Sequence, residues 1–231
     1  MSTMVMRLSP PTQSQNLTFR RLRAFGAIVG LFLAGCSAGS SQRLVPIVRM
    51  VQVGASGCGS DEVAAGFVVR PGVVMTVAHV LADTSIVTVD GRPATVVSVD
   101  ERMDAALLET DVGGERSVVF ADPVLSDTAV ILRWQARQLQ RIDVTVTTVA
   151  PIDYSDLRLG TRWLRQGLLV DHESRAGDSG APVLDQAGRV IGMLFASRTE
   201  GKPEGFALAA SEMQALMSAD PVVPGWVGRC S

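Results

Sequence analysis

The feature that most constrains the fold is a series of short apolar runs, rich in valine, isoleucine and threonine, that follows Leu44. Glycine, proline and aspartate interrupt these runs, and such residues favour turns over the interiors of helices. Short strands at a spacing of roughly 8–12 residues are typical of a β-sandwich or a pair of barrels. The sequence therefore predicts an all-β fold. The predicted strands are 67–69, 73–77, 86–89, 95–99, 143–149, 168–170, 182–184, 190–195 and 206–208.

Two local signals add a hairpin and a helix to this pattern. An Asp-Gly pair at 90–91 lies between two of the runs and predicts a tight hairpin. One helix is predicted near the end of the chain, where Ser211 can cap it and Gln214 completes a capping box. Its apolar stripe is formed by Met213, Leu216 and Met217.

Charge and composition argue against two classes of function. The formal net charge is −2, which disfavours a protein that binds nucleic acid by neutralising phosphates, so no nucleic-acid partner is expected. With only two histidines, the chain has little material for a histidine-rich metal site, and no metal is expected. Chemistry that needs an imidazole must therefore use His79 or His172.

The first 35 residues have the pattern of an export signal. They contain four arginines and no acidic residue, and an apolar run of 11 residues at 24–34 is too short to span a membrane. The run ends in Leu-Ala-Gly-Cys at 33–36, which resembles the bacterial lipobox. That resemblance implies cleavage before Cys36 and a lipid on its thiol, followed by a flexible tether at 36–44. An ordinary signal peptide is the alternative.

A Gly-Asp-Ser-Gly-Ala-Pro sequence at 177–182 is the strongest local signal for chemistry. A serine between glycines on a tight turn is exposed, and the backbone around it can approach a substrate closely. The N–H groups of Gly177 and Ser179 could point to one spot and form an oxyanion hole. Taken alone, the same sequence also fits a simple loop.

Two further motifs carry a histidine and an aspartate. A β-rich run ends in Ala-His at 78–79, and Asp104 opens the apolar run Ala-Ala-Leu-Leu. Taken alone, each residue also has a purely structural interpretation: a histidine at the end of a strand and an aspartate in a turn. His172 is an alternative base and Asp100 an alternative acid, but neither has the local context of the first pair.

In the order His79, Asp104, Ser179, the three motifs resemble those of the trypsin/chymotrypsin-like serine proteases. That family carries Thr/Ser-Ala-Ala/Gly-His, Asp-(Ile/Ala)-Ala-Leu-Leu and Gly-Asp-Ser-Gly-Gly-Pro. The resemblance implies a serine endopeptidase in which His79 activates Ser179, Asp104 orients His79, and Gly177 and Ser179 hold the oxyanion. It implies a protein or peptide substrate, an acyl-enzyme, and no metal or cofactor.

The resemblance covers roughly residues 58–230 and implies an all-β fold of two antiparallel barrels with a short C-terminal helix. The protease domain would be 45–231, with the first barrel at about 45–125 and the second at about 126–231. Because His79 and Asp104 fall in the first part and Ser179 in the second, the active site would lie between the barrels.

Within the family, the chain resembles the actinobacterial envelope proteases of the mycobacterial acid-resistance type. Those share a Cys-Gly pair and a Gly-x-Cys near the C-terminus, which are Cys58-Gly59 and Gly228-Arg229-Cys230 here. This pattern, with export to an oxidising compartment, implies a disulfide between Cys58 and Cys230. Two buried free thiols are the alternative reading.

The family pattern also suggests where a substrate side chain would bind. The residue six positions before the nucleophile lies at the base of the specificity pocket, which implies Glu173 and a preference for arginine or lysine. The strand at 192–196 resembles the one that lines the cleft, which implies Phe195 and Ala196. A solvated loop charge is the alternative for Glu173.

In trypsin-like zymogens, a newly cut amino terminus pairs with the aspartate before the nucleophile. Asp178 holds that position, but the chain has no Arg-Ile-Val-Gly-Gly sequence and its mature terminus would carry a lipid. The sequence therefore predicts another partner for Asp178, either Arg175 or solvent, and an enzyme that needs no such cleavage.

Together these features predict an exported serine endopeptidase that a lipid anchors to the outer face of a bacterial membrane, in the periplasm or cell envelope. Two alternatives belong to other functional classes. One is a catalytically inactive protease-like lipoprotein that binds peptides in the same cleft. The other is a structural envelope lipoprotein without a reactive serine.

Overall fold

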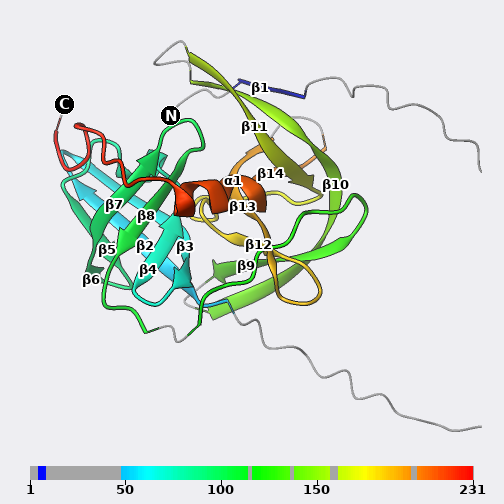
Figure 1. Cartoon of the computed structure of the whole chain (residues 1–231), viewed down its shortest axis with the longest axis horizontal. Coiled ribbons are helices and arrows are strands. Elements are labelled where there is room, and N and C mark those ends of the chain that lie inside the picture. The colour runs from blue at the N-terminus through cyan, green and yellow to red at the C-terminus, as the bar shows by residue number, and fades with distance from the viewer. Residues whose placement is uncertain are drawn as a thin grey trace, which may run out of the picture.

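The structure is a computed structural model, and it describes residues 5–8, 48–113, 116–135, 138–156, 161–198 and 202–230. Most of the predicted signal segment, Cys36 and the predicted tether lie outside the described residues. Strands dominate the described part, which falls into two sheets with one α-helix near the end of the chain (Figure 1).

The first sheet contains seven strands in the order β6-β5-β2-β3-β4-β8-β7, and every pairing is antiparallel. It is a curved, open sheet, because β6 and β7 at its two edges do not pair with each other. Its strands are β2 (Met50–Gly57), β3 (Ser60–Arg70), β4 (Val73–Thr76), β5 (Ile86–Val89), β6 (Arg92–Pro93), β7 (Thr95–Asp100) and β8 (Ala105–Glu109).

The second sheet closes on itself because the long strand β10 pairs with both β9 and β11. The short strand β1 (Val5–Leu8) lies on the outer edge of β10. The expected all-β fold is thus confirmed, with a closed antiparallel second barrel and a first barrel that is a half-barrel, open between β6 and β7. The other strands are β9 (Thr128–Gln135), β10 (Gln138–Asp156), β11 (Thr161–Val170), β12 (Pro182–Leu184), β13 (Val190–Arg198) and β14 (Glu204–Ala209).

Strand β3 of the first sheet is buried over more than half of its length. All six of its residues from Ala64 to Val69 are buried, whereas a strand with one face in solvent shows alternating burial. β3 also contacts the second barrel through its backbone, because the N–H of Ala65 donates to the carbonyl of Ser179 at 2.8 Å.

The predicted hairpin forms, but it closes on a different strand. Asp90 and Gly91 have φ angles of 50° and 76°, as a two-residue turn with both residues in the left-handed region requires. The turn joins β5 to the two-residue strand β6, and the run at 95–99 becomes β7, which pairs with β8. The predicted hairpin partner was wrong because the run at 95–99 pairs with β8, which lies farther along the chain.

The predicted helix forms as α1 (Ala210–Ser218), with Met213 and Leu216 buried. It begins one residue before the predicted cap, and its N-cap residue Ala209 makes no side-chain hydrogen bond. The predicted capping box at Ser211 and Gln214 was therefore wrong. β14 runs directly into the helix, so the chain enters α1 from a strand and leaves no separate cap position.

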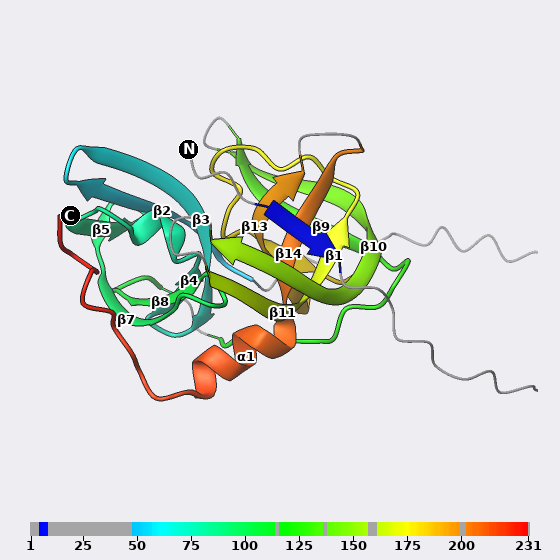
Figure 2. The same ribbon diagram turned by 90° about the horizontal axis from the view of Figure 1, so that it is seen from above.

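After α1 the chain returns to the first barrel. Figure 2 shows this last segment passing from α1 beside the first sheet. The N–H of Val99 donates to the carbonyl of Val222 at 2.7 Å, and the predicted disulfide between Cys58 and Cys230 is present. In the described part of the chain, no helix combines the length and hydropathy needed to cross a membrane.

Candidate active site

His79 and Asp104 lie at the meeting ends of two paired strands. β4 ends at Thr76 and leads into a short 3₁₀ helix that begins at His79, while Asp104 directly precedes β8. Because β4 and β8 are antiparallel, with Thr76 opposite Ala106, the end of one strand meets the start of the other. The topology therefore places the two side chains next to each other.

Two hydrogen bonds join the carboxylate of Asp104 to His79. Oδ2 lies 2.8 Å from Nδ1 of the imidazole, and Oδ1 accepts the backbone N–H of His79 at 2.8 Å. Asp104 is 4% exposed and has a φ of 52°, so a left-handed turn presents its buried carboxylate to the histidine. Nδ1 is occupied by this bond, and Nε2 is left as the nitrogen that can exchange a proton with a reacting group.

The pKa of His79 is raised above its ordinary value of 6.5 by a balance of opposing effects. Burial is the largest single effect and lowers the pKa, but the charge of Asp104 and its hydrogen bond together outweigh it. Glu62 adds to the rise and Arg165 opposes it. The neutral imidazole that a general base requires is therefore present only above this raised pKa.

The nucleophile turn, defined as residues 177–180, is shaped by two glycines. Gly177 and Gly180 have φ angles of 90° and 88°, which residues with a Cβ rarely adopt. At Gly180 a side chain is also excluded by contact, because a Cβ would lie 2.0 Å from the carbonyl oxygen of Ala65. A glycine is required here because the turn packs directly against the backbone of β3.

The nucleophile turn is bonded to the first barrel at the same point. Ala65 donates its N–H to the carbonyl of Ser179 at 2.8 Å, and its own carbonyl accepts the hydroxyl of Thr76 at 2.7 Å. Thr76 is three residues before His79. Ser179 and the segment that carries His79 are thus held by hydrogen bonds to one residue of β3.

The N–H groups around Ser179 divide into two sets. Asp178, Gly180 and Ala181 each donate to a backbone carbonyl, at distances of 2.7–3.0 Å. Within the described residues, the N–H groups of Gly177 and Ser179 donate to no protein acceptor. These two are the groups that the sequence assigned to an oxyanion hole.

Arg133, which the sequence reasoning missed, is the partner of Asp178. Its Nε donates to the carboxylate at 2.8 Å, and its Nη2 donates to the same carboxylate in a close, fully buried ion pair. Arg175 contributes its backbone N–H at 2.7 Å, while solvent is excluded because Asp178 is 3% exposed. The signal in the sequence was an arginine directly after the apolar run Ala-Val-Ile-Leu at 129–132.

The remaining predicted residues occupy different environments. Glu173 is exposed, and its carbonyl accepts a hydrogen bond from Arg133. Phe195 is 2% exposed and lies beneath the guanidinium of Arg165, 4.0 Å from the ring centre, so only its backbone is left to line a cleft. Ala196 is half-buried beside it on β13. The role of these three residues in a substrate pocket stays a prediction.

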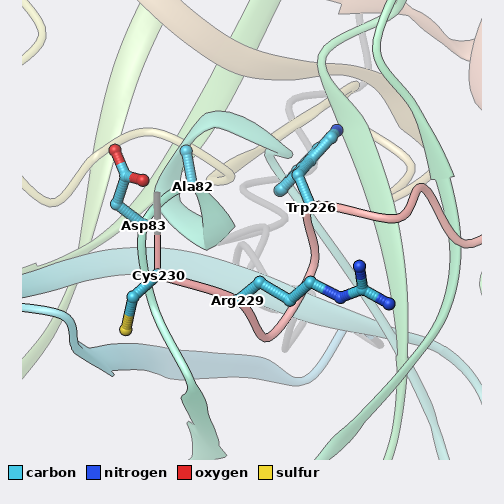
Figure 3. A pocket seen from close by; sticks show the side chains of 5 residues that line it. All are labelled: Ala82, Asp83, Trp226, Arg229 and Cys230. Atoms are coloured by element: carbon cyan, nitrogen blue, oxygen red, sulfur yellow. The ribbon is translucent and has the colours of Figure 1, made fainter.

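A pocket of about 220 Å³ lies where the last segment of the chain meets the loop after His79 (Figure 3). None of the predicted catalytic residues lines it. It is bounded by Ala82, Asp83, Trp226, Arg229 and Cys230.

Comparison with known proteins places this geometry in a family. Residues 64–193, more than half of the chain, match the family model of the trypsin-like peptidase domain. The chain belongs to the trypsin-like peptidase family. The matched segment includes His79, Asp104 and Ser179.

Relatives of this trypsin-like peptidase include the serine protease Rv3671c of Mycobacterium tuberculosis, which is 31% identical over 177 residues. The match covers 71% of this chain and 44% of Rv3671c, so the chain spans less than half the length of that relative. The crystal structure of the active form of Rv3671c protease superposes with a TM-score of 0.71 at 26% identity, covering 78% of this chain and 85% of that one.

A more distant likeness shows the fold alone. The serine endoprotease from Yersinia pestis is 20% identical, with a TM-score of 0.60, and the match covers 76% of this chain and 62% of that one.

Proposed function

We propose that this trypsin-like peptidase is a serine endopeptidase whose triad is Ser179, His79 and Asp104. Ser179 Oγ attacks the carbonyl carbon of a peptide bond, and His79 Nε2 takes the hydroxyl proton. The same imidazole then donates that proton to the leaving amine, and water hydrolyses the resulting acyl-enzyme. Asp104 holds the imidazole with Nδ1–H toward its carboxylate and stabilises the charged form.

The observation that carries the proposal is the pair of N–H groups at Gly177 and Ser179 that have no acceptor within the described residues. Backbone N–H groups near a nucleophile are the donors that stabilise a developing oxyanion, and removal of one such donor typically costs about 3 kcal/mol of activation free energy. The N–H groups of the buried residues Asp178, Gly180 and Ala181 are all paired, whereas those of the partly exposed Gly177 and Ser179 are left available to a ligand.

A fluorophosphonate probe tests the proposal directly, because it reacts only with an activated serine. We expect labelling of the wild type at pH 8 and none in S179A or H79A. S211A is the matched control, since Ser211 is an exposed serine on α1, and it should label like the wild type. A folded wild-type protein that resists the probe would show the inactive peptide-binding alternative instead.

We further propose that the enzyme is exported and held at the outer face of a bacterial membrane by a lipid on Cys36. The support is the lipobox-like sequence at 33–36, which overlaps the end of an apolar run of signal-peptide length. Labelled fatty acid should be incorporated in cells that express the wild type and not in those that express C36S. Equal incorporation by both proteins would contradict the anchor.

A further inference from the structure

Arg133 connects three parts of the loop that leads from β11 to Ser179. Its Nε donates to Asp178 at 2.8 Å, and one N–H of Nη2 donates to the same carboxylate. The other N–H of Nη2 is shared between Nε2 of His172, 2.8 Å away, and the carbonyl of Glu173 at 3.2 Å. The arginine side chain is 6% exposed. One buried guanidinium therefore fixes the loop from its first residues to the aspartate beside Ser179.

The contact between Arg133 and His172 requires a neutral imidazole. A guanidinium only donates hydrogen bonds, so Nε2 of His172 must accept and its proton must lie on Nδ1. Protonation of Nε2 would direct an N–H at a nitrogen that has no lone pair. It would also bring two positive charges to 2.8 Å within a half-buried site.

The groups around His172 keep it in that neutral form. Arg133 faces it from β9, Arg175 and Asp178 face it from the loop, and Asp171 precedes it in the chain. Burial is the main reason that the pKa of His172 lies below its ordinary value of 6.5, followed by the charge of Arg133, and the two carboxylates only partly oppose this.

We propose that neutral His172 is a positioning residue for the nucleophile turn: it holds Arg133, which holds Asp178 next to Ser179. Protonation of His172 breaks the contact with Arg133 and loosens the loop that presents Ser179 and the two oxyanion N–H groups. The inference rests on the proposed function, and it adds the protonation of His172 as a second ionisation that lowers activity at acid pH. Of the two histidines, His79 acts on the substrate and His172 acts through Arg133.

The test compares kcat/KM against pH for the wild type and H172Q, over the pH range in which circular dichroism shows both proteins folded. Glutamine retains an acceptor near the position of Nε2 but does not titrate. On the acid side of the profile, kcat/KM of H172Q should fall about tenfold per pH unit, as one ionisation requires. In the wild type this fall should steepen toward about a hundredfold per pH unit below the second ionisation.

R175Q is the matched control, because it removes the other cation near His172 while leaving the backbone N–H that bonds Asp178. Its acid limb should keep the steep second part. Limbs of the same slope in the wild type and H172Q would overturn the inference. A wild type without turnover or probe labelling at pH 8 would instead contradict the proposed function.

A second measurement uses the NMR spectrum of the wild type and needs neither turnover nor an active H172Q variant. In ¹⁵N spectra of the wild type, the amides of Gly177 and Ser179 should shift with a midpoint below pH 6.5 that matches the His172 ring. The ring signals are easily assigned, since the chain has two histidines. Amide shifts that follow only the higher midpoint of His79 would overturn the inference.

Discussion

At the scale of single residues, the carboxylate of Asp104 decides the direction in which the pKa of His79 is shifted. The pKa of His79 is raised because the charge and hydrogen bond of Asp104 outweigh burial. A raised pKa means that the folded enzyme holds the imidazole proton to a higher pH than a free histidine does. In the proposed mechanism the base must be neutral, so we expect activity to be lost as pH falls through a midpoint above 6.5.

We predict that D104N lowers kcat on the order of 10⁴-fold, because the amide no longer favours the required tautomer. The midpoint of the acid limb should also move to lower pH, since the stabilising charge is gone. The measurement is kcat and kcat/KM between pH 5 and pH 9. D100N is the control, because the carboxylate of Asp100 bonds the N–H groups of Arg102 and Met103 and makes no described contact with His79.

A midpoint in D104N equal to that of the wild type would mean that another group sets the pKa of His79. A loss in D100N as large as that in D104N would favour Asp100, the alternative that the sequence left open.

At the scale of elements, β9 and the nucleophile turn are joined by a buried ion pair. Arg133 lies near the end of β9 and Asp178 lies in the turn before β12, with side chains that are 6% and 4% exposed. Breaking a buried pair leaves an uncompensated charge, which typically costs about 3–5 kcal/mol. The buried pair thus fixes the nucleophile turn relative to β9.

We predict that R133M lowers the free energy of unfolding by about 3–5 kcal/mol, because it leaves the buried carboxylate of Asp178 without its charged partner. R189M is the matched control: Arg189 pairs with Asp185 at 2.6 Å, but its side chain is 52% exposed. That surface pair should be worth about 0–1 kcal/mol. Urea unfolding of the three proteins gives both numbers, and equal losses would refute the distinction.

The elements also show where local sequence is enough and where it is not. The strands at 86–89 and 182–184 match β5 and β12, because alternation, turn residues and β-branched side chains are local signals. The predictions of the strand that pairs across the turn at 90–91 and of the first residue of α1 were wrong. The hairpin prediction failed because β7 pairs with β8, a strand that lies later in the chain. The helix prediction failed because β14 runs without a break into α1, so the helix begins at Ala210.

At the scale of the whole molecule, the last segment of the chain closes over the first barrel. The disulfide between Cys58 and Cys230 joins residues 172 positions apart, and Val222 adds a backbone hydrogen bond to β7. The C-terminus is thus tied to the N-terminal barrel although the segment before it, α1, follows the last strand of the second barrel.

We predict that the double variant C58S/C230S lowers the free energy of unfolding by up to about 5 kcal/mol, the value that loop entropy gives for so long a loop. The reason is that the unfolded chain regains the freedom that the cross-link removes. C36S is the control, since it keeps both bonded sulfurs and should unfold like the wild type. Unfolding curves that coincide for all three proteins would contradict a stabilising role for the disulfide.

The sequence by itself determined the fold class, the family and the three motifs, because each depends on residues that are neighbours in the chain. It also led to the disulfide, through a resemblance at both ends of the domain. It named Arg175, which bonds Asp178 only through its backbone N–H, but missed Arg133 as the charged partner and did not connect Arg133 with His172. Those contacts join residues that are 45 and 39 positions apart. Only the tertiary structure decided them, because which charges share a buried site depends on how the strands pack.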